Sequence, residues 1–130
     1  MAQPNEPVAK RRQSRGMTAY LSGAAAEGAV AKQYERAGWT ILERRWRGKA
    51  GEIDLIVARG DVMAFVEVKK SKTKDAAIAS LHPRQLARIA AAAEVYFLQL
   101  DETEVRDMRI DLAAVDGAGR VEILENLTLW

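Results

Sequence analysis

Apolar residues recur with a helical period near the start of this chain and with a strand-like pattern after it. Residues 18–37 form an Ala-rich run with helical spacing, and Gly38 supplies a stop signal, so a helix is predicted there. Three segments rich in β-branched and aromatic residues then predict strands: WTILERRWR, EIDLIVAR and VMAFVEVKK. The last two are apolar on both faces, which is typical of strands covered by helices on both sides.

A second helix and two short strands complete the pattern. The helix is expected over residues 79–100 with Pro83 in its first turn, and the strands over residues 108–115 and 121–125. The order αβββαββ predicts an α/β fold in which helices flank a mixed sheet. Residues 1–16 are polar and basic with almost no apolar spacing, which predicts a flexible N-terminal arm before a single domain over residues 17–130.

Composition narrows the chemistry that this domain can carry. The chain has 130 residues and no cysteine, which excludes disulfides, thiolate zinc sites and cysteine nucleophiles. Any metal must therefore bind oxygen ligands or His82, the only histidine, which we expect to be a helix cap or a surface residue. The sequence shows neither a signal peptide nor an apolar window of membrane length, so we expect a cytoplasmic protein with no membrane partner.

Charge is divided unevenly along the chain. Residues 1–100 carry 17 basic and 10 acidic side chains, a net charge of +7, whereas residues 101–130 carry 3 and 8, a net charge of −5. A basic part suits phosphate binding, although many basic proteins merely solvate their charge. The acidic end would pair with the protein's own basic face or with a second subunit, which leaves a homodimer open.

Two charged residues interrupt the third predicted strand on one face. Strand alternation puts Glu67 and Lys69 on the same side, with Cα atoms about 6.6–6.8 Å apart. A two-residue turn at Gly60-Asp61 would pair Asp54 of the preceding strand directly with Glu67, and a turn one residue earlier would make the two diagonal neighbours. A three-residue loop would put them on opposite faces.

Two carboxylates and an ammonium group on an apolar sheet are costly unless they serve one another or a metal. Mg²⁺, or Mn²⁺ in its place, prefers oxygen ligands, so Asp54 and Glu67 are candidate ligands together with the carbonyl oxygen of Val68. Lys69 would orient a water molecule or stabilise developing charge during phosphodiester hydrolysis. A structural ion pair is the alternative interpretation of these residues.

Other charged residues are candidates for supporting roles. Glu27 shares the apolar stripe of the first helix with Tyr20 and Tyr34, so it is either a further site carboxylate or a buried acid with a salt-bridge partner. Asp111 interrupts a late strand and is interpreted as structural. Basic residues near Trp46 and after the third strand are candidate nucleic-acid contacts, or else solvated charge: Arg44, Arg45, Arg47, Lys70, Lys72 and Lys74.

The segment GEIDLIVARGDVMAFVEVKK and the pair Gly23 and Glu27 together resemble the YraN family of bacterial proteins. Residues 51–56 match its GEIDLI element, residues 65–69 match its FVEVK element, and the similarity spans about residues 16–115. That family resembles restriction-endonuclease-like nucleases, above all the archaeal Holliday-junction resolvases. The resemblance implies a restriction-endonuclease-like fold and places the site on Asp54, Glu67 and Lys69, with Glu27 as a helical member.

This chain departs from the family pattern at two positions. Ser71 stands where the family usually has an arginine, and Gln85 stands where it often has a lysine, both of them phosphate-contacting positions. Lys70, Lys72 and Lys74 would compensate for the first, and Gln85 could still hydrogen-bond to substrate. Activity or substrate preference would differ accordingly.

Three hypotheses follow from the sequence. The first is a Mg²⁺-dependent endonuclease that acts on DNA in preference to RNA, with branched DNA or repair and recombination intermediates as its substrates. The second is a catalytically inactive nucleic-acid-binding module that retains the fold. The third is a protein-interaction subunit in which the buried charges only specify packing.

Overall fold

The structure is a computed structural model of the chain, and it describes residues 23–100 and 107–127. The basic arm expected over residues 1–16 and Tyr20 lie outside the described residues. A helix covers residues 23–36 and is called the N-terminal helix below. The other elements follow in chain order: β1 (Thr40–Gly48), β2 (Gly51–Arg59), β3 (Val62–Lys70), α2 (Lys74–Ser80), α3 (Pro83–Leu98), β4 (Asp107–Val115) and β5 (Val121–Leu124).

The five strands form one mixed sheet in the order β1-β2-β3-β4-β5. Neighbours pair antiparallel except β3 and β4, which pair parallel from Val62↔Asp107 to Lys70↔Val115. Two parallel strands need a crossover connection, and α2 and α3 provide it. The mixed α/β architecture predicted from the sequence is confirmed, and it is compatible with a restriction-endonuclease-like fold.

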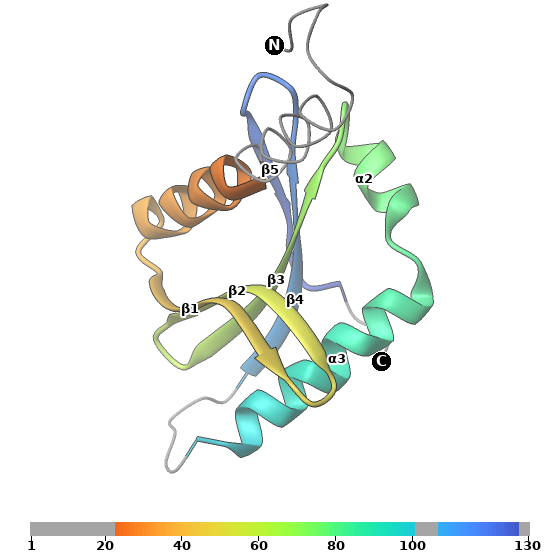
Figure 1. The fold of residues 1–130 in the computed structure, drawn as a ribbon. Coiled ribbons are helices and arrows are strands. Elements are labelled where there is room, and N and C mark those ends of the chain that lie inside the picture. Colours follow the sequence, from red (N-terminus) through yellow and green to blue (C-terminus); the bar gives the residue numbers. More distant parts are fainter. Residues whose placement is uncertain (1–22, 101–106, 128–130) are drawn as a thin grey trace, which may run out of the picture.

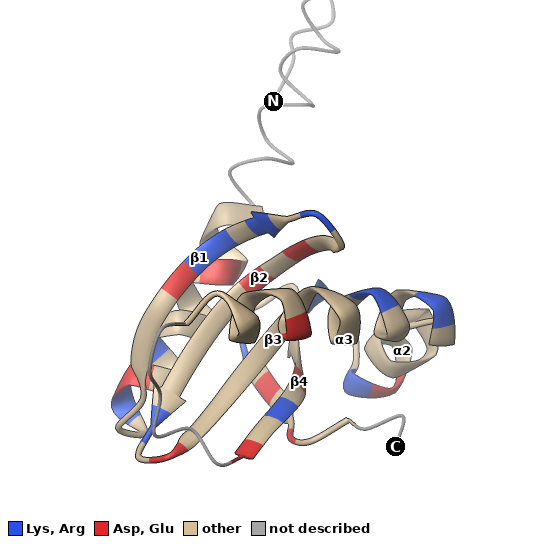
Figure 2. Ribbon diagram, turned by 90° about the horizontal axis from the view of Figure 1, so that it is seen from below, with Lys and Arg blue, Asp and Glu red and all other residues tan. Residues whose placement is uncertain are grey.

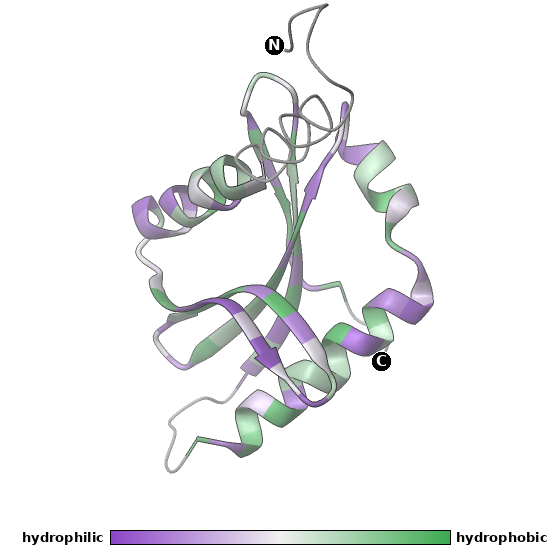
Figure 3. Cartoon of the chain, viewed as in Figure 1, coloured by the Kyte–Doolittle hydropathy of each residue, from purple (hydrophilic) through white to green (hydrophobic). Residues whose placement is uncertain are grey.

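Helices cover both faces of the sheet (Figure 1). On one face, Val30 and Tyr34 of the N-terminal helix pack with Val66 of β3. On the other, Ala92 of α3 packs with Phe65, because successive side chains of a strand point to opposite faces. Hydrophobic residues accordingly fill the central strands and alternate with polar ones along the helices (Figure 3). Within the described residues, no helix is long and apolar enough to cross a membrane.

The helix expected over residues 79–100 is observed as α3, and a short helix that was not expected, α2, precedes it, so the observed order is αβββααββ. Pro83 disfavours helical geometry in the residue before it, and His82 is extended at φ −78° and ψ 151°. Pro83 then occupies the first turn of α3, as predicted. Thr73 starts α2 by accepting a hydrogen bond at Oγ1 from the Ala76 N–H at 3.0 Å.

A buried acid ties the N-terminal helix to β4. Asp111 is fully buried on β4 and accepts a 2.7 Å hydrogen bond from the Tyr34 hydroxyl and a 3.0 Å bond from the Asn126 N–H. Arg109 Nε lies 3.1 Å from its Oδ1. Burial and the negative charge of Asp111 raise the pKa of Tyr34, so the hydroxyl keeps its proton. Asp111 thus has the structural role expected of it.

Candidate active site

The β2–β3 hairpin has the register that brings Asp54 and Glu67 together. A two-residue turn at Gly60 and Asp61 joins the strands, and the paired positions run from Arg59↔Val62 to Leu55↔Val66. The next pair in this register would be Asp54 and Glu67. The ladder ends one residue before it, so the strands separate where the two carboxylates lie.

The alternation of side chains along β2 is interrupted at Asp54. Leu55 packs under the N-terminal helix, whereas Ile53 packs under α3. Strict alternation would put both side chains on one face. Arg45 lies between the β1 partners of these two residues and has a φ of 50°, in the left-handed region that a non-glycine residue seldom adopts. This local irregularity lies at the point where β2 separates from β3, which is where the Asp54 side chain is found.

The Asp54 carboxylate takes over a hydrogen bond that the ladder would have made. Its Oδ2 accepts the Val68 N–H at 2.8 Å. Burial raises the pKa of Asp54, the Val68 hydrogen bond opposes this shift, and the negative charge of Glu27 adds to it. Asp54 is therefore positioned by backbone and kept near other carboxylates.

Glu67 lies on the face that α3 covers and contacts two side chains. Gln85 Nε2 donates a 2.9 Å hydrogen bond to Glu67 Oε1, and Lys69 Nζ lies 3.7 Å from the same oxygen. The Glu67 side chain is only 13% exposed. Burial and then the charge of Asp54 raise its pKa to about 7, although Lys69 opposes the shift. The Asp54 carboxylate therefore destabilises the charged form of Glu67.

Glu27 comes close to this pair but has a partner of its own. Arg45 Nε donates a 2.8 Å hydrogen bond to Glu27 Oε2, and the Glu27 side chain is 22% exposed. Its charge still contributes to the pKa of Asp54. Glu27 therefore has the salt-bridge partner expected of a structural acid. It also lies near the site, as expected of a further site carboxylate.

The donor set at the separation of β2 and β3 fits a magnesium-like ion. Among residues 23–100 and 107–127, no group of three or more His, Asp or Glu side chains is arranged to hold a metal. Mg²⁺ does not need one, because it commonly binds through one or two carboxylates and completes its shell with water and substrate oxygens. Asp54 and Glu67 meet that need, and the Val68 carbonyl belongs to the residue whose N–H binds Asp54. A cation between them would offset their mutual repulsion.

The predicted nucleic-acid contacts are spread over several elements. Arg45 is bound to Glu27 and Arg47 Nε lies 3.6 Å from Glu52 Oε2, while Arg44 is exposed. Lys70 is the exposed last residue of β3. Gln85, the candidate phosphate contact on α3, donates a hydrogen bond to Glu67. Sequence spacing alone gave no signal for that contact, because the contact depends on where α2 ends and α3 begins.

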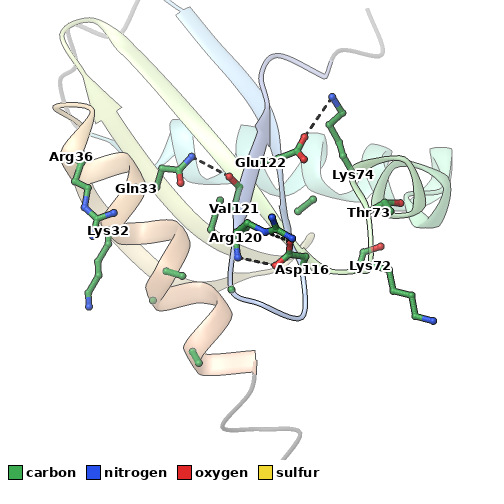
Figure 4. A pocket seen from close by; sticks show the side chains of 16 residues that line it. Lys32, Gln33, Arg36, Lys72, Thr73, Lys74, Asp116, Arg120, Val121 and Glu122 are labelled. Atoms are coloured by element: carbon green, nitrogen blue, oxygen red, sulfur yellow. Dashed lines mark hydrogen bonds and ion pairs between the residues drawn. The ribbon is translucent and has the colours of Figure 1, made fainter.

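Two of the predicted lysines line a separate cavity. It has a volume of about 1080 Å³ and lies between the N-terminal helix, residues 71–74 and the β4–β5 hairpin (Figure 4). Lys72 and Lys74 line it, and Lys74 Nζ lies 3.6 Å from Glu122 Oε2. Ser71 lies here too. The expected path of phosphates from β3 along these lysines therefore leads away from Glu67, toward the face covered by the N-terminal helix.

The raised pKa of Glu67 predicts a pH dependence of stability. The group binds its proton more tightly in the folded state, where its pKa is about 7, than at its ordinary value of 4.5. Its contribution is therefore complete below pH 4.5 and is lost as the pH rises through 7. We expect the wild-type protein in EDTA to lose up to about 3 kcal/mol of unfolding free energy from this group between those limits.

Urea unfolding at pH 5 and pH 8 measures this effect, with Glu67→Gln as the comparison. The variant cannot titrate at this position, so its unfolding free energy should fall less between the two pH values. Equal falls in the two proteins would show that Glu67 has an ordinary pKa.

Comparison with known proteins identifies the family. The profile of the uncharacterised protein family UPF0102 matches residues 26–115. A UPF0102 protein from Dinoroseobacter shibae is 47% identical over 123 residues, covering 95% of this chain and 92% of the relative. One from Ruegeria pomeroyi is 48% identical over 113 residues, covering 87% and 92%. The chain therefore belongs to the uncharacterised protein family UPF0102, which confirms the resemblance to YraN proteins.

Proposed function

We propose that this protein is a metal-dependent endonuclease that hydrolyses phosphodiester bonds, with DNA as its preferred substrate. One observation carries the proposal: the carboxylates of Asp54 and Glu67 adjoin where β2 and β3 separate, with the Lys69 ammonium group 3.7 Å from Glu67 Oε1. These groups interrupt strands whose central side chains are core. A packed sheet tolerates such a cluster when it has a ligand to bind.

The chemistry assigns each residue a distinct part. Hydrolysis forms one P–O bond from water and breaks one P–O bond to a sugar oxygen, which leaves as an alcohol once it gains a proton. A bound Mg²⁺ supplies Lewis-acid stabilisation of the charge on the phosphoryl oxygens. Asp54 and Glu67 would hold the ion, with the Val68 N–H fixing the Asp54 carboxylate. Lys69 would orient the water or stabilise the transition-state charge.

Gln85 acts in this scheme as a positioning residue. Its amide fixes the Glu67 carboxylate through a 2.9 Å hydrogen bond from the first turn of α3. Metal-binding carboxylates are commonly oriented by such neighbours. The likeness of YraN proteins to junction resolvases favours branched DNA or repair and recombination intermediates as substrates.

A second candidate function is binding of nucleic acid without hydrolysis. The residue that favours this second function is Gln85, which contacts Glu67. Its neutral amide occupies a position at which the family often has a lysine. A site that has lost a cation there would bind a phosphate less tightly in the transition state. The fold and its basic surface would then serve binding alone.

Incubation of the full chain with duplex, single-stranded and branched DNA, and with RNA, in Mg²⁺ or Mn²⁺ separates these functions. Cleavage should occur and should fall about 100-fold or more in Lys69→Ala, because the ammonium group contributes transition-state stabilisation. Lys32→Ala removes an exposed lysine of the N-terminal helix and should cleave like the wild type. Binding without cleavage would favour the second function, and full activity of Lys69→Ala would remove the role given to Lys69.

A further inference from the structure

Two arginines on α3 stand beside the candidate site and were not predicted to bind nucleic acid. Arg84 and Arg88 are exposed and lie four residues apart, which puts them on one side of the helix. Basic residues of α3 accordingly occur in its half nearest α2 (Figure 2). The buried side of α3 is formed by Ile89, Ala92 and Ala93, so the arginine side points away from the core.

The part of α3 that carries these arginines adjoins both strands that carry the carboxylates. Gln85, next to Arg84 in sequence, donates its hydrogen bond to Glu67 of β3. A Cβ atom built on Gly51, the first residue of β2, would lie 3.9 Å from the Arg88 carbonyl oxygen. Arg88 therefore stands at the start of the strand that carries Asp54, and Arg84 stands one helical turn nearer the start of α3.

The charges of Arg84 and Arg88 are not used inside the described part of the protein. None of the ion pairs within residues 23–100 and 107–127 involves either of them. The β1 arginines differ, since Arg45 pairs with Glu27 and Arg47 with Glu52. A polyanion approaching two carboxylates is repelled unless cations flank its path. The α3 arginines provide cations next to those carboxylates.

We propose that Arg84 and Arg88 bind phosphates of the nucleic-acid backbone and so hold the strand over Glu67 and Lys69. This inference rests on the proposed function, because it names the surface through which that substrate is held. Arginine suits the role because its planar guanidinium group binds phosphate oxygens in a bidentate manner and remains charged at all physiological pH values. The contacts fix the position of the strand and are independent of base sequence.

Salt-dependent binding of a fluorescent DNA duplex to the full chain tests this proposal, in EDTA so that metal-dependent cleavage does not occur. The slope of log Kobs against log[KCl] is negative, and its magnitude should decrease by about 1.8 in Arg84→Ala/Arg88→Ala, since each phosphate contact contributes about 0.9. The matched control is Lys32→Ala/Arg36→Ala, which removes two exposed cations from the N-terminal helix and should keep the wild-type slope. Arg84→Lys/Arg88→Lys should also keep most of the slope.

Each outcome decides the proposal. An unchanged slope in the α3 variant, an equal fall in the control variant, or a wild-type protein that does not bind DNA would overturn it. A fall confined to the α3 variant supports it, even if the wild type fails to cleave in Mg²⁺, in which case only the hydrolytic function is lost. Cleavage by the wild type with no effect of the arginines would leave the hydrolytic function standing without this surface.

Discussion

Replacing the buried Asp111 with alanine should destabilise the protein by about 3–5 kcal/mol, the usual cost of removing one partner of a buried ion pair. The substitution leaves Arg109 beside a cavity with the exposed Glu125 as its remaining carboxylate, and it removes the acceptor of the Tyr34 hydroxyl and of the Asn126 N–H. Each buried donor that loses its partner adds its own desolvation penalty. Urea unfolding monitored by circular dichroism measures the change.

A surface acid provides the control for this prediction. Glu122 is 62% exposed and pairs with Lys74, so Glu122→Ala should cost no more than about 1 kcal/mol. If Asp111→Ala also lowers the unfolding free energy by less than about 1 kcal/mol, the network that joins the N-terminal helix to β4 contributes little to stability.

The strands and the candidate hairpin registers were predictable because they follow from local patterns. Alternation placed Glu67 and Lys69 on one face, and the structure has the first of the turns considered, at Gly60 and Asp61, whose register brings Asp54 next to Glu67. Both signals depend only on neighbouring residues along the chain. The central pair of carboxylates was therefore a candidate from the sequence, and the register that brings the two together needed the structure.

The features that the sequence did not indicate depend on tertiary packing. The change of face at Asp54 requires the left-handed conformation of Arg45 and the packing of Ile53 under α3. The contact between Gln85 and Glu67 requires a helix break before Pro83, which the spacing of apolar residues did not show. Lys72 and Lys74 were candidate phosphate contacts or solvated charge, and the start of α2 places both of them at the cavity beside the N-terminal helix.

Substituting asparagine for Asp54 should lower the single-turnover rate of DNA cleavage by about 100-fold to 1,000-fold, the range for losing one group that stabilises transition-state charge. Asparagine keeps the shape of the side chain and an acceptor for the Val68 N–H, so the fold should persist. The substitution removes the negative charge that would bind the cation. DNA affinity in EDTA should stay near the wild-type value or rise slightly, because a repulsive charge is lost.

Glu52→Gln is the matched control, since Glu52 is an exposed acid two residues away on the same strand. It removes one negative charge from β2 without touching the pair of carboxylates, and cleavage by this variant should match the wild type. Equal losses of activity in Asp54→Asn and Glu52→Gln would point to a general electrostatic effect in place of a metal ligand.

The central claim is that Asp54 and Glu67 hold a divalent cation for hydrolysis, and restoring the metal to protein freed of it tests this most directly. Wild-type protein dialysed against EDTA is mixed with branched and duplex DNA, and the cleavage rate is measured before and after Mg²⁺ is added. We expect no cleavage before addition, cleavage after it, and a rate about 100-fold to 1,000-fold lower in Asp54→Asn. Cleavage in EDTA, or equal cleavage by Asp54→Asn once Mg²⁺ is present, would contradict it.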